Sequence, residues 1–459
     1  MSNQLIYKHN AFEGYIGVAQ EDITPPAGIY ARNWGAASHD VADGTDIPLR
    51  TVVMTLQSAP EEKPLVLVTL DLGWWKSADD EWRIRGAILE ELNLTEDRVI
   101  VNLTHTHSGP GITSDDKDKP GGEFISAYLD QVRDAVLRAC ERALNTKVLS
   151  TLTWDYGRCS LARNRDLPDP EKDRVVCGFN PAAAADDTLL VGRVCDGAGK
   201  VLLTIANYAC HPTTLAWQNH LISPDWVGAF YQTVESATGG LAMFLQGASG
   251  ELQPARTYTD DLEIIRAQGR QLGYATLSVL EGMLPPGQQL EYDGVVESGA
   301  PLACWKTVTA SANKKLYTER VEIDLPLKED LPSLEEIERQ LADCKDRVLA
   351  ERLTRKMHVR RKVGNGSATK SPLWIWRIGD SIIFAAPNES YSLLQTSLRA
   401  HFENRAVAVI NLANGSASGY LPPAELYQKD IYQVWQTPFA EGGLEKLIEV
   451  AKASVESDR

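Results

Sequence analysis

The stretch "KPLVLVTLDLGWWKSADDEWRIRGAILEELNLTEDRVIVNL", residues 63–103, decides the fold class of this chain. Its first part, residues 65–72, is a nearly continuous apolar run, which is typical of a strand buried on both faces. Residues 77–93 then carry apolar side chains at helical spacing, and residues 97–103 return to a short apolar run. A buried strand, a helix and a second buried strand in this order indicate an α/β protein.

The same alternation continues along the first two-thirds of the chain. An amphipathic helix, a hairpin with a Gly-containing turn, a second helix and a further buried strand are expected at 123–144, 188–209, 225–238 and 240–247. We therefore predict an α/β fold with mixed β-sheets flanked by helices.

The pattern of predicted strands and helices changes after about residue 290. A strand-rich piece precedes a helix that begins at Ser333, where Glu336 completes a capping box. The basic end of that helical pattern, "RKMHVRRK" at 355–362, is interpreted as a solvated helix end. A hairpin that turns at Gly379 follows. We expect residues 1–459 to form one unit, with a subdivision near residue 290.

Charge and composition exclude several classes of function. The formal net charge of −16 repels phosphate backbones, so nucleic acid is not expected as a partner. No run of eighteen apolar residues predicts a membrane span, and the N-terminus lacks the features of a secretory signal. The seven cysteines include no C-x-x-C pair, so a reducing, cytoplasmic setting is expected.

Unusual polar residues follow several of the predicted strands. "NLTHTHSGPG" carries His105 and His107, whose side chains would point to the same side if the backbone stayed extended. His211 ends another apolar strand, Glu251 lies in the loop "FLQGASGELQP", and Glu389 follows a third strand. Ordinary hydrogen-bonding or capping roles would also explain such residues. Two or three histidines with one carboxylate would suit zinc.

Five motifs together resemble the neutral ceramidase family, zinc amidases that cleave the N-acyl bond of ceramide. They are "GVAQEDITPPAG", "THTHSGPG", "NHLISPDWVGAF", "PNE" and "GYLPPAELY", the last followed by a tyrosine at the family's spacing. They occur in the family's order from residue 17 to Tyr432. The resemblance thus covers nearly the whole chain and implies the fold of that family's catalytic domain.

The resemblance also implies roles for individual residues. The zinc ligands would be His105, His211, Glu389 and Tyr420, and His107 would be the histidine beside the metal. Tyr432 would fall in the substrate pocket. The segment "ARNRD" resembles the family's Asn-Arg segment, which would bring Asn164 and Arg165 to the site to bind a substrate oxygen.

The sequence departs from the family at two points. Gln253 stands where the ceramidases carry a serine that has been cast as the nucleophile, and Ser249 lies four residues earlier. The sequence ends 27 residues after Tyr432, too few for the family's C-terminal immunoglobulin-like domain of roughly one hundred residues. We therefore expect a catalytic unit without that domain, acting on a soluble substrate rather than on ceramide.

These observations predict a zinc hydrolase in which metal-bound water attacks a small amide, N-acyl or ester substrate. His107 or Glu251 would carry the proton, and zinc with Tyr432 or Arg165 would stabilise the oxyanion. Gln253 is expected to contact the substrate.

Two alternatives remain at this point. The chain has eleven Trp against eight Phe, and Trp34, Trp74, Trp75 and Trp217 lie near predicted strand ends, where indoles would stack on a sugar. The enzyme would then act on a carbohydrate, with Trp217 in the substrate site. The other alternative is a metal-binding protein without catalysis, since the family's serine is missing.

Overall fold

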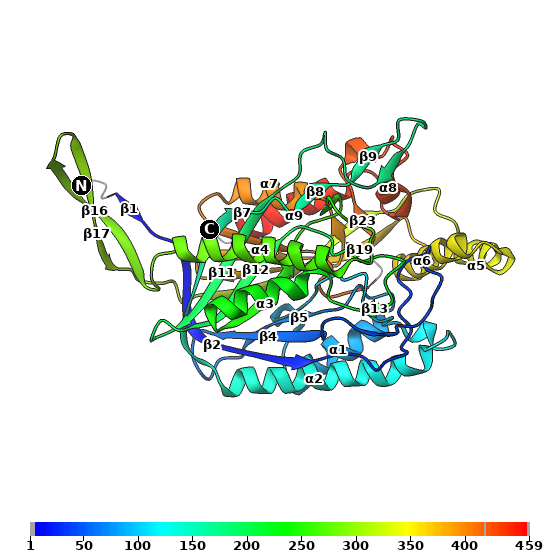
Figure 1. Ribbon diagram of the computed structural model, residues 1–459, viewed down its shortest axis with the longest axis horizontal. Helices are drawn as coiled ribbons and strands as arrows, with labels where there is room; N and C mark the ends of the chain where they lie inside the picture. The colour runs from blue at the N-terminus through cyan, green and yellow to red at the C-terminus, as the bar shows by residue number, and fades with distance from the viewer. Residues whose placement is uncertain (1–4, 417–418, 457–459) are drawn as a thin grey trace.

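The computed structural model describes residues 5–416 and 419–456 and confirms the α/β class (Figure 1). An eight-stranded mixed sheet has the order β14-β12-β11-β7-β2-β4-β5-β6. In that order its strands are Leu241–Gln246, Val201–Tyr208, Thr188–Asp196, Val148–Arg158, Asn10–Asp22, Arg50–Gln57, Leu65–Leu70 and Val99–Leu103. The predicted strand–helix–strand unit is present. Along the chain β5 comes before α1 (Ala78–Glu91) and β6 after it, and the two strands pair in parallel.

A second sheet has four strands in the order β18-β19-β20-β22. They are Leu316–Pro326, Ala368–Ile378, Ser381–Ala385 and Ala406–Ile410. The hairpin of β19 and β20 turns at Gly379, as predicted, with a positive φ of 58° that glycine adopts without steric cost.

The helices cover the outer faces of the two sheets. One hydrophobic cluster joins the first sheet to α1 and α2 (Ile125–Asn145), and another joins it to α3 (Trp226–Thr238) and α4 (Leu262–Gly282). The second sheet packs on α7 (Leu393–His401) and α9 (Gly443–Glu456). The inner faces of both sheets meet each other in a third cluster that includes Phe12, Trp154, Trp374 and Trp376.

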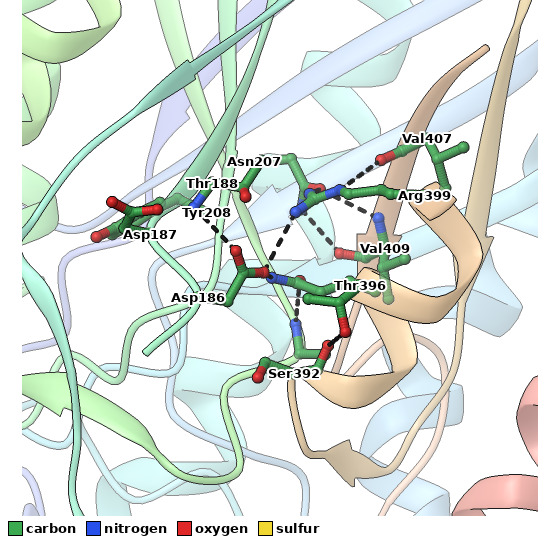
Figure 2. Close-up of polar contacts among 12 residues, drawn as sticks. Asp186, Asp187, Thr188, Asn207, Tyr208, Ser392, Thr396, Arg399, Val407 and Val409 are labelled. Atoms are coloured by element: carbon green, nitrogen blue, oxygen red, sulfur yellow. Dashed lines mark hydrogen bonds and ion pairs between the residues drawn. The ribbon is translucent and has the colours of Figure 1, made fainter. Parts of the chain in front are cut away.

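Residues on both sides of position 290 therefore build one core, and polar bonds hold it together. In Figure 2, Asn207 of β12 exchanges two hydrogen bonds with the backbone of Val409 in β22, at 2.8 and 3.1 Å. Arg399 of α7 donates to the same Asn207 side chain and to the carbonyl of Val407. Satisfied buried polar groups of this kind fix the two sheets in one relative position.

Short ladders and turns surround the sheets. The two-stranded ladders pair β3 (Gly44–Thr45) with β13 (Leu221–Ile222), β8 (Ala162–Asn164) with β15 (Leu252–Pro254), β9 (Asp166–Pro168) with β10 (Val175–Cys177), and β21 (Glu389–Ser390) with β23 (Tyr420–Leu421). The short helical turns are Glu96–Arg98, Ser114–Asp116, Gly122–Phe124, Ala424–Leu426 and α8 (Tyr432–Gln436). At the left of Figure 1, β1 (Ile6–Tyr7), β16 (Gln288–Glu297) and β17 (Pro301–Thr309) form a separate three-stranded sheet that projects from the body.

The helical pattern after Ser333 forms two helices rather than one. Ser333 does cap α5 (Leu334–Asp343), accepting a hydrogen bond from the backbone N–H of Glu336. The chain then becomes extended at Cys344, and α6 (Arg347–Val363) begins after Asp346, whose carboxylate caps it. A side chain that caps a helix start favours a non-helical backbone at its own position, which explains the break.

Candidate metal centre

The candidate residues meet because several strands end at the same place. The pairs β5–β6, β12–β14 and β20–β22 are each parallel. His105 follows β6, His211 follows β12, and Glu389 follows β20. Loops at the carboxyl ends of parallel strands gather in this way in many α/β proteins, where they form ligand sites.

His105, His211 and Glu389 form a compact cluster of metal-ligating groups. Their three ligand atoms lie within 4.8 Å of one another. Glu389 Oε2 is 3.4 Å from His105 Nε2 and 3.2 Å from His211 Nε2. Two imidazoles and one carboxylate are a donor set that zinc and similar transition metals accept.

The backbone orients both imidazoles toward this point. The Nδ1 of His105 lies 3.1 Å from the carbonyl of Gly73, and that of His211 lies 3.0 Å from the carbonyl of Leu252. These contacts fix the hydrogen on Nδ1 and leave Nε2 as the lone-pair donor, which is the arrangement that metal-ligating histidines adopt. The buried Nε2 of His105 makes no hydrogen bond to any residue that the structure describes.

The backbone around His105 is not extended, so the condition under which His105 and His107 would share one face of a strand is not met. β6 ends at Leu103, and His105 has a φ of +72°, in the left-handed region that few non-glycine residues occupy. The rings of His105 and His107 nevertheless lie 4.8 Å apart and line the same cavity. A left-handed backbone at His105, held in place by its surroundings, brings the two rings together beyond the end of the strand.

Glu389 and Tyr420 face each other in the two-residue parallel ladder of β21 and β23. Burial would raise the pKa of Glu389, but the imidazoles of His105 and His211 outweigh it and hold that pKa well below its usual range. Burial and the nearby Glu389 carboxylate raise the pKa of Tyr420. The Tyr420 hydroxyl accepts a hydrogen bond of 3.2 Å from Arg165 Nη2, so Arg165 positions Tyr420.

A cavity of about 90 Å³ opens beside the cluster. Its walls are formed by Trp74, Trp75, Lys76, Leu103, His105, His107, Arg355, His358, Val359, Pro387, Glu389, Leu412, Gly415, Gly419, Tyr420, Tyr432 and Gln436. A water molecule needs about 10–15 Å³ by this measure, so the cavity would hold several waters or a small polar group.

His107 stands beside the three clustered groups without belonging to them. Its backbone N–H donates to the carbonyl of Pro212 at 3.2 Å, and its ring packs between Trp34 and Trp74, with centroids 5.2 and 4.8 Å away. Among the described residues, neither ring nitrogen has a hydrogen-bond partner. Burial, with His105 and His211 close by, lowers the pKa of His107 well below its ordinary value. The ring is therefore held in place with both nitrogens available to a substrate.

Several predicted site residues lie away from the cavity walls. Asn164 accepts a hydrogen bond from the backbone of Asp166 and belongs to the β8–β15 ladder. Gln253 accepts one from Tyr258, whose ring in turn stacks on the half-exposed Trp217 at 5.9 Å. Ser249 Oγ accepts a hydrogen bond from Gln246, and Arg165 donates to the carbonyl of Gly250. None of these side chains lines the cavity.

Glu251 is held by the start of α7. Both of its carboxylate oxygens accept a hydrogen bond of 3.0 Å from the backbone N–H of Ser392, and the Ser392 hydroxyl also donates to Glu251. The carboxylate is buried and is not among the groups that line the cavity. These contacts bind the Glu251 carboxylate to the start of α7, outside the cavity wall.

The burial of Glu251 predicts a pH-dependent contribution to stability. Burial raises its pKa from 4.5 to about 7, so its contribution is fully present below pH 4.5 and is lost as the pH rises to 7. Relative to wild type, Glu251→Gln should therefore gain about 3 kcal/mol in unfolding free energy between pH 4.5 and pH 8. Urea unfolding at the two pH values would measure this difference. Glu263→Gln, at an exposed position on α4, is the control, and an equal pH response of both variants would contradict the prediction.

The interpretation of residues 355–362 as a solvated helix end was wrong in part. Arg355 and His358, one helical turn apart on α6, both line the cavity, and only 6% of His358 is exposed. Lys76, directly after the two tryptophans, was also missed. A charged helix face normally faces solvent, and only the position of α6 over the site shows that this one does not.

The fold and this cluster define the chain as an α/β protein with a candidate metal centre of two histidines and one carboxylate. Residues 15–250 match the family model for the N-terminal part of the neutral/alkaline non-lysosomal ceramidases. This match covers half of the chain, which therefore belongs to that family.

Two further similarities agree with the family. The neutral ceramidase of Pseudomonas aeruginosa is 28% identical over an alignment of 256 residues that covers 52% of this chain and 34% of that protein. The crystal structure of the same organism's neutral ceramidase superposes with a TM-score of 0.70 at 19% identity, over 97% of this chain and 75% of that one. A ceramidase complexed with C2 gives a TM-score of 0.69 at 17% identity over 97% and 76%. These structures confirm the predicted fold, and the curated relative is matched over about a third of its length.

Proposed function

We propose that this chain is a zinc-dependent hydrolase that acts on a soluble amide, N-acyl or ester substrate. The observation that supports this most directly is the cluster of His105, His211 and Glu389, with both Nε2 atoms oriented toward one point beside a cavity. Membership of the ceramidase family supports the same reaction class.

The residues present fit a zinc ion. The Nε2 atoms of His105 and His211 and the Glu389 carboxylate face one another within 4.8 Å, and a cation between them would take a lone pair from each. Tyr420, paired with Glu389, would be the fourth ligand. A zinc ion held there would supply a Lewis acid that polarises a carbonyl and lowers the pKa of water.

The other residues have separate proposed roles. His107, with both nitrogens free and its ring fixed by two tryptophans, would accept a proton from water and return it to the leaving group. Tyr432, whose ring lies 5.6 Å from that of Tyr420 in the cavity wall, would stabilise the oxyanion. Arg165 would act indirectly, by fixing Tyr420.

No serine route is proposed. Gln253 cannot be a nucleophile, and Ser249 is buried and hydrogen-bonded to Gln246 away from the cavity. Water is therefore the proposed nucleophile.

The cavity favours an amide or ester over a sugar. Glycosidases generally use two carboxylates on either side of the bond. Among the described residues that line the cavity, Glu389 is the only carboxylate, and it faces two histidines. Trp74 and Trp75 line the cavity but Trp217 does not.

The described part of the chain contains no helix long and apolar enough to cross a membrane.

We also propose that residues 1–459 act as one unit, because His105 and His211 precede position 290 whereas Glu389 and Tyr420 follow it.

Turnover of a panel of N-acyl amines and esters, with and without a chelator, tests the hydrolase proposal. Activity should vanish on metal removal and return when zinc is added. Turnover that survives complete metal removal would contradict it.

A further inference from the structure

The wall of the cavity that α6 covers is basic. Lys76 and Arg355 both line it, and the carboxylates that pair with them, Asp116 and Glu351, do not. Glu389, the only carboxylate among the described lining residues, belongs to the metal cluster. The charge that faces a bound molecule is therefore positive, while the counter-charges lie behind the wall.

Hydrogen bonds fix the Arg355 and Lys76 side chains of this wall and leave some of their N–H groups without an acceptor among the described residues. Arg355 Nε bonds Glu351 at 3.1 Å and its Nη2 bonds the carbonyl of Asn33 at 2.8 Å. Within the described residues its Nη1 makes no hydrogen bond, and Lys76 Nζ makes one, at 3.4 Å to Asp116. These partners orient the cations and leave donors for a ligand.

Two further polar atoms of the same wall are buried and unpartnered. They are the indole Nε1 of Trp75, a residue 2% exposed, and Nδ1 of His358, whose Nε2 lies 3.5 Å from Asp115. The Trp75 indole can only donate, and a buried donor with no acceptor among the described residues is costly, so a water or a ligand commonly supplies the acceptor. With its Nε2 toward Asp115, neutral His358 presents Nδ1 as an acceptor.

This basic wall lies close to the reacting centre. The Arg355 guanidinium is 5.5 Å from the ring centroid of Trp74, and that ring is 4.8 Å from the ring of His107. One aromatic side chain thus spans the distance between the cation and the proposed proton acceptor. A ligand group at Arg355 would be within a few bonds of a carbonyl at the metal.

We infer that the substrate carries a carboxylate a few bonds from the scissile amide, and that Arg355 and Lys76 bind it; this rests on the proposed hydrolase function. An N-acyl amino acid has this arrangement. The guanidinium binds a carboxylate with directed, charge-assisted hydrogen bonds, and Lys76 adds a point charge beside it.

The test compares an acid with its neutral amide. Calorimetric titration of the zinc-loaded full chain with N-benzoylglycine and with N-benzoylglycinamide should show that the acid binds roughly 10- to 100-fold more tightly. In Arg355→Gln this ratio should fall at least tenfold. Lys76→Gln should lower it as well, and serves if Arg355→Gln does not fold. Arg352→Gln changes an exposed arginine of α6 that stacks on Trp435, and should keep the wild-type ratio.

A metal-free protein separates this inference from binding at the metal itself. The variant His105→Asn, His211→Ala should still prefer the acid over the amide. Equal affinity for the two compounds, no binding of either, a preference that both basic-wall variants retain, or a preference that disappears with the metal would each overturn the inference. Turnover is measured separately: an intact preference without hydrolysis would contradict the proposed function and leave the carboxylate site standing.

Discussion

Replacement of His105 by asparagine and of His211 by alanine in one chain should reduce the zinc content from about one ion per chain to near none. Hydrolysis should fall to the background rate at the same time. The two imidazoles are two of the three clustered donors, and the Glu389 carboxylate and Tyr420 hydroxyl that remain are too few to hold a transition metal tightly. Mass spectrometry of the untagged protein measures the metal, and the substrate panel measures the activity.

The choice of substitutions keeps the backbone intact. Asparagine tolerates the left-handed φ of +72° at position 105, whereas alanine there would add strain unrelated to the metal. His401→Ala is the matched control, because His401 is a histidine on α7 that pairs with Glu456 outside the cavity. A double variant that kept one zinc per chain would show that these histidines are not the ligands. A folded, zinc-supplied wild type without metal would remove the basis of the hydrolase proposal.

His107→Ala should retain the metal and lose the activity, by roughly 10²- to 10⁴-fold in kcat. The ring of His107 lies beside the metal cluster and outside it, and its two nitrogens are free to exchange a proton with water and the leaving group. Zinc content and kcat on the best substrate of the panel, measured on the same preparation, separate these two effects.

Rescue by imidazole is a further test of the role of His107. Added imidazole should restore part of the lost rate in His107→Ala, because the substitution leaves a space between Trp34 and Trp74. Loss of zinc together with activity would instead make His107 a ligand. Unchanged kcat would assign the proton transfer to another group.

The fold class could be predicted from the sequence because its signals are local. The apolar run at 65–70 and the helical spacing that follows it depend only on which side chains are close along the chain, and each became the expected element. The N-cap at Ser333 was predicted correctly for the same reason, although the pattern after it concealed the break at Cys344.

The assembly of the site was accessible only through family resemblance. Nothing local in the sequence connects His105 with Glu389, which is 284 residues further on, and the resemblance supplied that connection. The structure brings both residues together with His211, as that resemblance implied. It also separates residues that the motifs had grouped with the site: Glu251 is bound to the start of α7, and Asn164 and Gln253 are bound to neighbouring loop residues.

The sequence by itself determined the strands, the helices and the polar residues placed at their ends, since these depend on local spacing and hydrophobicity. Only the tertiary structure decided what faces the cavity. Arg355 and His358 have the sequence of a solvated helix end, yet α6 lies over the site and turns them toward it. The direction that a charged side chain faces depends on which distant element packs beside it, and spacing along the chain carries no information about that contact.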